Sequence, residues 1–468
     1  LALQKEYYEQ LKLVQQRIGF KYIRGHGLFN EDMSILQVRR DFMHPDAEPV
    51  IEYNFTYLDL VFDSYLELNI RPFIELGFMP KAIASGEQIV FYWQGNVTPP
   101  RDYRDWTNLV KATLRHLIDR YGAAEALTWP IEVWNEPNLG GFWKDADRPE
   151  YLKLFKETIL AVKEVNPGFR VGGPAICGVD DETWLRDFLD FVKAEKLPLD
   201  FVTRHLYCIS NPEPDGRYGY PKLRALEDAC GETERSRALI DSYPEFQGME
   251  MHVTEFNTSY SPRTPIHDTN LNAAYTAFLL SKLGDDNASY SYWTFGDIFE
   301  EQGVPFTPFH GGFGLVANGG ITKPTFYAFE FFKALGEDKC VFRSGEGVIT
   351  EQTGKFKGVF WNLKREELNL NLKLPLNNAS VVTKTVDPQT CNPLKLWHDI
   401  GEPANPVPAQ TALLREAARP LIKSFRTEDG SVELKLAPDA LVYFEAQEAP
   451  VISDWGFDYD RAADAWEE

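Results

Sequence analysis

Two glutamates in this sequence each close an apolar, β-branched run. Glu136 closes the run in "WPIEVWNEPN", and Glu255 closes the run in "MEMHVTEFN". Cleavage of a glycosidic bond uses a pair of carboxyl groups. One is protonated and protonates the leaving oxygen, and the other is ionised and attacks the anomeric carbon or activates water. The two glutamates are therefore candidates for the reactive pair of a glycosidase.

The neighbours of the two glutamates favour different protonation states, as such a pair requires. Glu136 is flanked by Trp134 and Pro137, and apolar surroundings raise the pKa of a carboxyl group because burial disfavours its charged form. Glu255 stands two residues before Asn257, and hydrogen-bond donors there would stabilise a carboxylate. The pattern predicts Glu136 as the acid and Glu255 as the ionised partner.

Simpler interpretations of the same residues are open at this point. A single glutamate in a strand is usually a structural ion pair or an exposed position, and Asn-Glu-Pro occurs in ordinary turns. His26 and His205, taken singly, fit hydrogen-bonded core histidines, and His252 and His310 have no metal-ligand spacing with another His or Cys. The sequence also contains no G-x-S-x-G and no phosphate-binding loop. We expect neither a metal nor an organic cofactor.

A scaffold must bring the two glutamates together. Eight strand-like segments alternate with helical patterns over the first three quarters of the chain. This alternation indicates a parallel sheet, and eight units fit a closed (β/α)8 barrel, whose catalytic residues lie at the carboxyl ends of the strands. An open doubly wound sheet is the alternative, but its usual G-x-G-x-x-G turn is missing. The predicted strands are 21–27, 50–54, 70–77, 129–136, 170–175, 200–207, 249–257 and 289–295.

The pattern changes after Gly336. Short alternating runs at 354–363, 379–387, 394–401 and 431–447 are separated by Gly, Asn, Asp and Pro, which is typical of a β-sandwich. We therefore expect an α/β protein with a (β/α)8 TIM barrel followed by a C-terminal β-sandwich. The expected units are a catalytic barrel over 1–336, an accessory sandwich over 337–448 and an acidic, aromatic tail over 449–468.

Composition limits the partners of this chain. A formal net charge of −22 repels phosphate backbones, so nucleic acid is not expected as a partner. No apolar run approaches the roughly 20 residues of a membrane span, so no membrane partner is expected either. The five cysteines are scattered and odd in number, which favours a reducing compartment. We expect the cytoplasm, with the periplasm as the alternative. The first residue is Leu1, so an upstream segment or signal can be missing.

Several motifs together resemble a known family. "WNEPNL" and "VTEFNTSYSP", with "KYIRGHGLF", "ELGFMP", "FYWQGNVTPP", "VGGPAICG" and "SYWTFGDIFEE", are similar to glycoside hydrolase family 39, specifically its bacterial β-xylosidases. The likeness runs in order from about residue 1 to residue 336. It implies a retaining double displacement with Glu136 as general acid/base and Glu255 as nucleophile. Relative to the family, a short N-terminal segment is expected to be missing, and 208–243 is expected to form a long loop after the sixth strand.

The resemblance also implies which residues bind the sugar. Asn135 would hydrogen-bond the substrate 2-hydroxyl. Glu301 is favoured over Glu300 by register. The residues expected around the sugar or the mouth of the site are His26, Asn135, Phe142, Trp143, His205, Tyr207, Trp293 and Glu301.

Four other functions are weighed against an exo-acting β-D-xylosidase that acts on short xylo-oligosaccharides. An α-L-iduronidase would need Arg or Lys for the substrate carboxylate, whereas Asp297, Glu300 and Glu301 repel anions. An arabinosidase activity is compatible with the same residues. An endo-xylanase would need an open groove. A non-catalytic carbohydrate-binding barrel would need no paired carboxylates. The oligomeric state, monomer or homo-oligomer, is not predicted.

Overall fold

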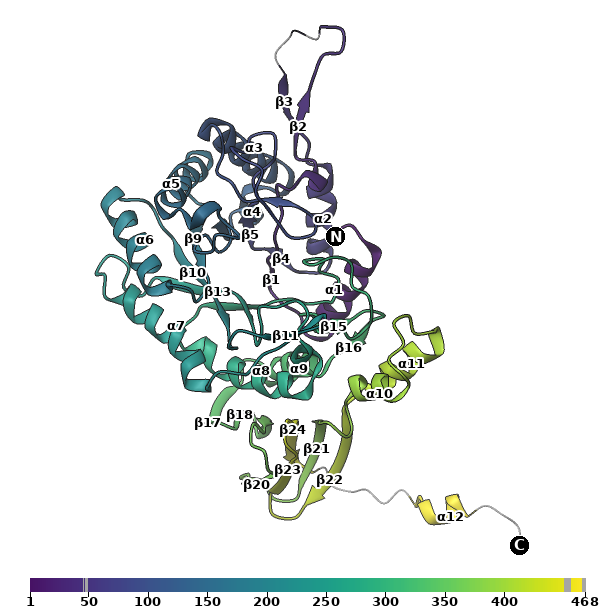
Figure 1. Ribbon diagram of the computed structural model, residues 1–468. Coiled ribbons are helices and arrows are strands. Elements are labelled where there is room, and N and C mark those ends of the chain that lie inside the picture. The colour runs from purple at the N-terminus through teal and green to yellow at the C-terminus, as the bar shows by residue number, and fades with distance from the viewer. Residues whose placement is uncertain (45, 47–48, 450–455, 465–468) are drawn as a thin grey trace.

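The structure is a computed structural model of the 468-residue chain and describes residues 1–44, 46, 49–449 and 456–464. Its first part is a mixed α/β fold around a parallel sheet of six strands (Figure 1). Two short strands, β1 (Tyr22–Ile23) and β4 (Arg71–Pro72), form a separate parallel pair. The order of the six strands is β14 (Ser289–Tyr292), β13 (Glu250–Asn257), β10 (Phe201–Tyr207), β9 (Val171–Ile176), β8 (Ile131–Val133) and β5 (Ile74–Leu76).

Every residue of strands β5, β8 and β9 is buried. This is typical of parallel strands, because both faces of a parallel sheet are covered. Close strand packing depends on small residues at one point. A Cβ atom on Gly172 would lie 2.2 Å from the ring of Phe201 on the adjacent strand β10. The glycine therefore lets β9 and β10 approach each other. Seven of the eight predicted strands take part in these parallel ladders.

The predicted strand 50–54 is the exception and was assigned wrongly. Val50–Tyr53 forms β3, which pairs antiparallel with β2 (Leu36–Arg39) in a hairpin that stands away from the rest of the molecule (Figure 1). Every residue of both strands is exposed or half-buried. The alternating pattern was therefore real, but it belongs to a two-stranded ribbon and not to a buried parallel strand. The described ladders do not join β14 to β1 into a closed ring.

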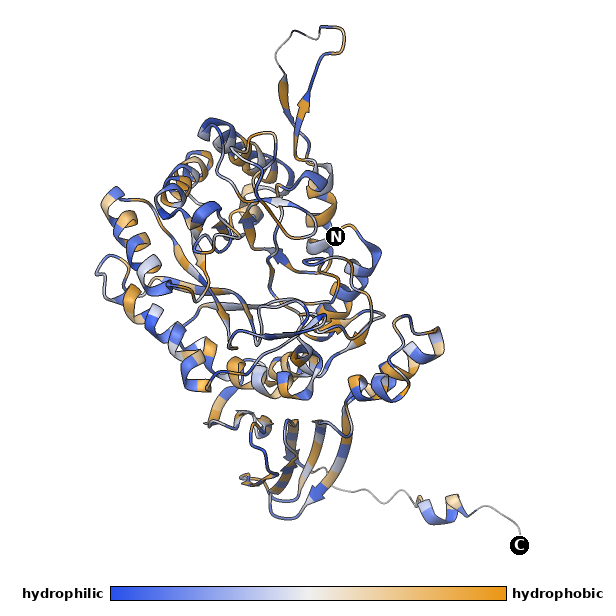
Figure 2. Ribbon diagram, viewed as in Figure 1, coloured by the Kyte–Doolittle hydropathy of each residue, from blue (hydrophilic) through white to orange (hydrophobic). Residues whose placement is uncertain are grey.

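The longer helices of the first part surround the parallel strands (Figure 1). Hydrophobic and hydrophilic stretches alternate along them (Figure 2), because each helix buries one face. In α3, the Asp102 side chain accepts from the Arg104 amide, and the helix ends at Gly122, whose φ is +80°. The helices are α1 (Lys5–Arg17), α2 (Thr56–Glu67), α3 (Tyr103–Tyr121), α5 (Arg148–Val165), α6 (Asp181–Glu195), α7 (Leu226–Asp241), α8 (Asn270–Lys282) and α9 (Pro324–Leu335).

Helix α7 corrects another expectation. Residues 208–243 were expected to form a long loop, but Leu226–Asp241 is helical, and only the part before it is irregular apart from the short hairpin β11 (Glu213–Asp215) and β12 (Tyr218–Tyr220). Among the described residues, no helix is long and apolar enough to cross a membrane.

The C-terminal part contains antiparallel sheets. Strands β20 (Leu368–Lys373) and β23 (Ser431–Leu436) form a two-stranded sheet. This sheet contributes Val432, Leu434 and Leu436 to a hydrophobic cluster that it shares with a larger, six-stranded sheet. Residues 394–401 were predicted as a strand, but most of them lie in helix α10 (Pro393–Asp399). The Asn392 cap and Pro393 at the first position favour a helix here. Helix α11 (Pro408–Ala417) follows. The larger sheet has the order β17 (Lys339–Arg343), β18 (Gly347–Gln352), β19 (Lys355–Trp361), β24 (Leu441–Glu448), β21 (Ala379–Val386) and β22 (Leu421–Thr427).

Two aromatic contacts connect the parallel and antiparallel parts. The rings of Phe331 on α9 and Tyr443 on β24 lie 5.5 Å apart, and those of Phe332 and Trp361 lie 6.3 Å apart. The predicted tail lies partly outside the described residues. Residues 456–464 of the tail are exposed and contain the short helix α12 (Tyr459–Ala463).

Candidate active site

The two glutamates meet at the carboxyl ends of the parallel strands. Glu136 follows β8, and its amide donates to the Ala175 carbonyl after β9 at 2.9 Å. Glu255 lies near the end of β13. One oxygen of each carboxyl group and one nitrogen of His205 lie within 4.8 Å of one another. This separation leaves no room for a water molecule between the carboxyl groups and fits a pair in which one group attacks the sugar directly, for which about 5–5.5 Å is typical.

Two donors hold the Glu255 carboxyl group, and a histidine lies beside it. The Tyr207 hydroxyl donates to Oε2 at 2.7 Å, and Arg24 Nη1 donates to Oε1. His26 Nε2 lies 3.3 Å from Oε1. Both oxygens are therefore fixed, and the side chain is only 4% exposed. Of the two neighbours that the sequence suggested for Glu255, His205 lies 3.5 Å from it, whereas Asn257 donates to the Trp293 carbonyl. The donors to Glu255 come from β10 and from the segment after β1.

Arg24 is the centre of a buried ionic network that the sequence did not assign to the site. Its guanidinium contacts Glu255, lies 2.7 Å from Glu132 Oε2 and 2.9 Å from Glu75 Oε2, and donates to Asn135 Oδ1 at 2.9 Å. Burial opposes its charge, but these carboxyl groups outweigh burial and raise its pKa. Arg24 thus positions the Glu255 carboxyl group and holds the Asn135 amide by its oxygen.

A signal for this network was present in the sequence. Arg24 and His26 stand two residues apart in the short segment that directly follows β1, so one segment brings both to the site. Glu75 and Glu132 stand within apolar segments, where a charge needs a buried partner. His26 completes the network through Nδ1, which lies 2.7 Å from Glu75 Oε2.

Glu136 has a different environment from Glu255. It is 6% exposed, and burial, only partly offset by His26 and Arg24, raises its pKa to about 7. Its Oε1 lies 2.8 Å from Nδ1 of His205. The difference agrees with the expectation from Trp134 and Pro137, and it gives the site one carboxyl group that is protonated near neutral pH.

Glu301 is the third carboxyl group of the pocket. Removal from water, followed by the charges of Glu255 and Glu136, raises its pKa to about 8. Its neighbour Glu300 is instead turned toward the start of α1, where Gln4 Nε2 donates to it at 3.5 Å. The structure therefore places Glu301, and not Glu300, beside the two glutamates.

Aromatic side chains surround the carboxyl groups. Trp293, which is 7% exposed, lies 4.6 Å from His26 and 5.0 Å from Phe299 between ring centroids. Phe91 lies 5.4 Å from Phe142 and 5.5 Å from His26. These rings bring both Phe142 and Trp293 to the pocket, as expected.

Trp143 does not lie at the mouth of the site. Its side chain is completely buried, its Nε1 donates to the Asp147 carbonyl at 2.8 Å, and its ring packs edge-on against Trp134 at 5.0 Å. Its expected role is corrected to packing behind Trp134, because the turn that carries it directs the ring into the core and not toward the pocket.

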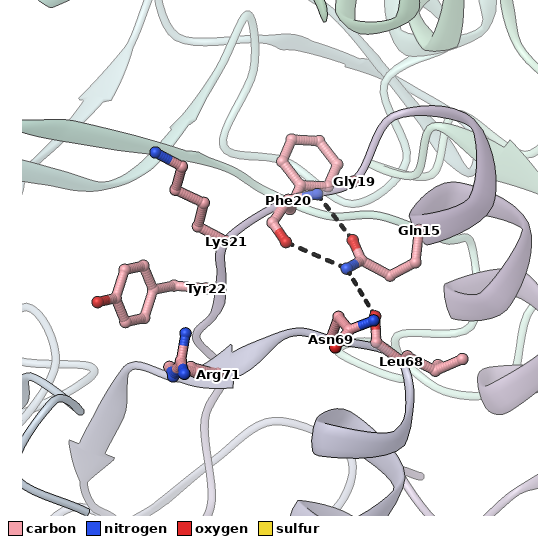
Figure 3. Close-up of a pocket in the computed structure, with 8 residues that line it drawn as sticks. All are labelled: Gln15, Gly19, Phe20, Lys21, Tyr22, Leu68, Asn69 and Arg71. Atoms are coloured by element: carbon pink, nitrogen blue, oxygen red, sulfur yellow. Dashed lines mark hydrogen bonds between the residues drawn. The ribbon is translucent and has the colours of Figure 1, made fainter. Parts of the chain in front are cut away.

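A cavity of about 400 Å³ lies at the opposite ends of the strands and is not this site (Figure 3). In Figure 3 the Gln15 amide bridges the chain at Phe20 and Leu68, with bonds of 3.1 Å to each carbonyl. Its lining residues include no carboxyl group and therefore offer no carboxyl pair for the cleavage of a glycosidic bond. Its lining residues are Gln15, Gly19, Phe20, Lys21, Tyr22, Leu68, Asn69 and Arg71.

Comparison with known proteins agrees with this geometry. The chain is 49% identical to a β-xylosidase of Geobacillus stearothermophilus over 449 residues, which cover 93% of this chain and 88% of that protein. It is 34% identical to a β-xylosidase of Caldicellulosiruptor saccharolyticus, over 96% and 91% of the two chains. The crystal structure of a monomeric β-xylosidase from Caulobacter crescentus superposes with a TM-score of 0.87 at 31% identity, over 96% and 94%. The sequence model of the glycosyl hydrolases family 39 matches residues 1–353, and the chain belongs to this family.

Proposed function

We propose that this protein is an exo-acting β-D-xylosidase that releases xylose from the non-reducing end of short xylo-oligosaccharides with retention of configuration. The single observation that carries the proposal is the close pair of Glu136 and Glu255 in opposite environments. The names of the two relatives described above supply the substrate class. A non-catalytic barrel would have no need for such a pair.

The reaction follows from the two environments. Glu255 attacks the anomeric carbon while Glu136 gives its proton to the glycosidic oxygen, so that the C–O bond breaks and the electron pair leaves with the aglycone. A covalent glycosyl-enzyme results. Esterification removes the negative charge of Glu255, which lowers the pKa of Glu136 and lets it accept a proton from the attacking water.

The remaining groups suit a neutral pentose. The Asn135 amide, held by Arg24, is available to donate to the 2-hydroxyl of the sugar. Glu301, with its raised pKa, can exchange hydrogen bonds with hydroxyl groups and would repel a uronate whenever it is ionised. These groups favour xylose over iduronic acid and are compatible with arabinopyranose as a side substrate.

We further propose the arrangement of units in which this site operates. The parallel strands and their helices belong to a (β/α)8 catalytic barrel over residues 1–336, and the antiparallel sheets form an accessory β-sandwich over 337–448, followed by the tail 449–468. All five cysteines are free thiols, which suits a reducing compartment such as the cytoplasm.

The proposal is tested by kcat/KM on 4-nitrophenyl β-D-xylopyranoside, α-L-arabinopyranoside, β-D-glucopyranoside and an α-L-iduronide. We expect a strong preference for the xyloside and near-complete loss of turnover in Glu255→Ala. Glu250→Ala is the matched control, because Glu250 lies at the exposed start of the same strand in an ion pair with Arg170. Preference for the iduronide would refute the substrate. Full activity of Glu255→Ala would refute the mechanism.

A further inference from the structure

His205 lies between the two glutamates. Its Nδ1 is 2.8 Å from Glu136 Oε1 and 3.5 Å from Glu255 Oε2. The side chain is completely buried, and β10 shifts its register against β13 at this residue, so that His205 stands opposite Glu255. Within the described part of the chain, Nε2 has no hydrogen-bond partner. All hydrogen bonding of the ring therefore takes place at Nδ1.

The imidazole is neutral in this environment. Burial is the largest influence and lowers its pKa to about 4, although carboxylates oppose the effect. A neutral imidazole carries one proton, on one nitrogen only. The charged and titratable groups that face it come from four strands or their ends: Arg24 and His26 from β1, Glu75 from β5, Glu132 and Glu136 from β8, and Glu255 from β13.

The hydrogen-bond partners decide which nitrogen carries this proton. With the proton on Nε2, a buried donor would have no acceptor, and the Nδ1 lone pair would face the Glu255 carboxylate. A protonated Glu136 could then donate to Nδ1, which would turn the acid proton away from the leaving group. With the proton on Nδ1, the ring donates to Glu136 Oε1, and only the Nε2 lone pair is unpaired. The second arrangement satisfies more groups.

We propose that His205 is a positioning residue that confines the acid proton of Glu136 to Oε2. This inference rests on the proposed function. Because Oε1 accepts the hydrogen bond from Nδ1, Oε2 is the oxygen that carries the proton given to the leaving group. In the second half of the reaction the same N–H stabilises the Glu136 carboxylate that takes a proton from water.

The test compares substrates that need an acid with substrates that do not. Phenyl β-D-xyloside has a poor leaving group, whereas the 2,4-dinitrophenyl group leaves without protonation. In His205→Leu we expect kcat/KM to fall about 10- to 100-fold on the phenyl xyloside, a fraction of what a general acid supplies. On the dinitrophenyl xyloside it should stay within about threefold. His205→Asn should restore most of the loss, because the Asn amide N–H can stand near the position of Nδ1–H.

His252→Leu is the matched control. His252 is also buried, with a pKa lowered to about 4, but it lies at the far end of β13, where Nδ1 is 2.8 Å from Ser289 Oγ. Its replacement should leave the ratio of the two activities unchanged. Equal losses on both substrates in His205→Leu, or a His205→Asn variant as impaired on the phenyl xyloside as the Leu variant, would overturn the proposal.

A second readout does not depend on activity. The Glu136 carboxyl can be titrated by ¹³C NMR, with Glu136→Gln to identify its signal. Loss of one hydrogen bond to the carboxylate in His205→Leu should raise the pKa of Glu136 by roughly 0.5–1 unit. An unchanged pKa would overturn the inference. If the wild-type protein fails to hydrolyse xylosides, the proposed function is wrong, and this titration still decides the role of His205.

Discussion

Glu136→Gln should stabilise the protein at alkaline pH relative to the wild type. Glutamine has nearly the shape of glutamate but does not ionise. Burial raises the pKa of Glu136 from the ordinary 4.5 to about 7. The stability linked to this raised pKa is fully present below about pH 4.5 and is lost as the pH rises through about 7, because the folded protein must then hold a buried charge.

The displacement of the pKa sets the magnitude. Moving from 4.5 to about 7, at about 1.4 kcal/mol per unit, corresponds to about 3 kcal/mol. The difference in stability between Glu136→Gln and wild type can be measured as the free energy of unfolding in urea. This difference should shift in favour of the variant by about 3 kcal/mol between pH 4.5 and pH 8.5. Comparing the two pH values cancels any constant effect of the substitution.

Glu250→Gln is the control for this measurement, since Glu250 is exposed and paired with Arg170. It should show little difference between the two pH values. The reasoning is refuted if Glu136→Gln changes the free energy of unfolding by the same amount at both pH values, because the carboxyl group would then ionise equally easily in the folded and unfolded chain.

Three other predictions follow from the same geometry. On phenyl β-D-xyloside, kcat/KM should fall about tenfold per pH unit above about pH 7, because Glu136 must be protonated; a rate that stays constant to pH 9 would contradict this role. Arg24→Met should lower kcat/KM by more than about 100-fold and the free energy of unfolding by about 3–5 kcal/mol, because it leaves buried carboxylates without a cation. Urea titration and kinetics of the variant and the wild type would test this, and equal values for the two proteins would contradict it. Trp143→Phe should leave KM for the xyloside unchanged and destabilise the protein by about 1–3 kcal/mol, whereas Phe142→Ala should raise KM; a raised KM in the tryptophan variant would return Trp143 to the pocket.

The sequence was sufficient to predict that Glu136 and Glu255 lie close together, because the signals involved are local. The apolar runs before Glu136 and Glu255 are strands, and parallel strands gather their carboxyl ends at one place. The acid character expected for Glu136 from its apolar neighbours also agrees with its raised pKa. Helices α2 and α3 follow equally local rules of periodicity and capping.

The wrong predictions concern residues whose role depends on which other residues they contact, and not residues whose local pattern was misinterpreted. The alternating residues at 50–53 look the same in a hairpin and in a barrel strand, and only the adjacent Leu36–Arg39 explains the difference. Whether Trp143 faces a sugar or a neighbouring Trp134 depends on tertiary packing. The Arg24 network likewise joins four strands or their ends that lie far apart in the sequence, so the buried Glu75 and Glu132 show that a partner is needed but not which residue it is.

The central claim, that Glu255 forms a covalent bond with the sugar, is tested most directly by trapping. A 2,4-dinitrophenyl 2-deoxy-2-fluoro-β-D-xyloside should inactivate the protein, and mass spectrometry of its peptides should locate one fluoroxylosyl group on Glu255. Slow reactivation with release of the fluoroxylose is the expected companion result. A label on another residue, or hydrolysis of xylosides with inversion and without any labelled peptide, would contradict the account.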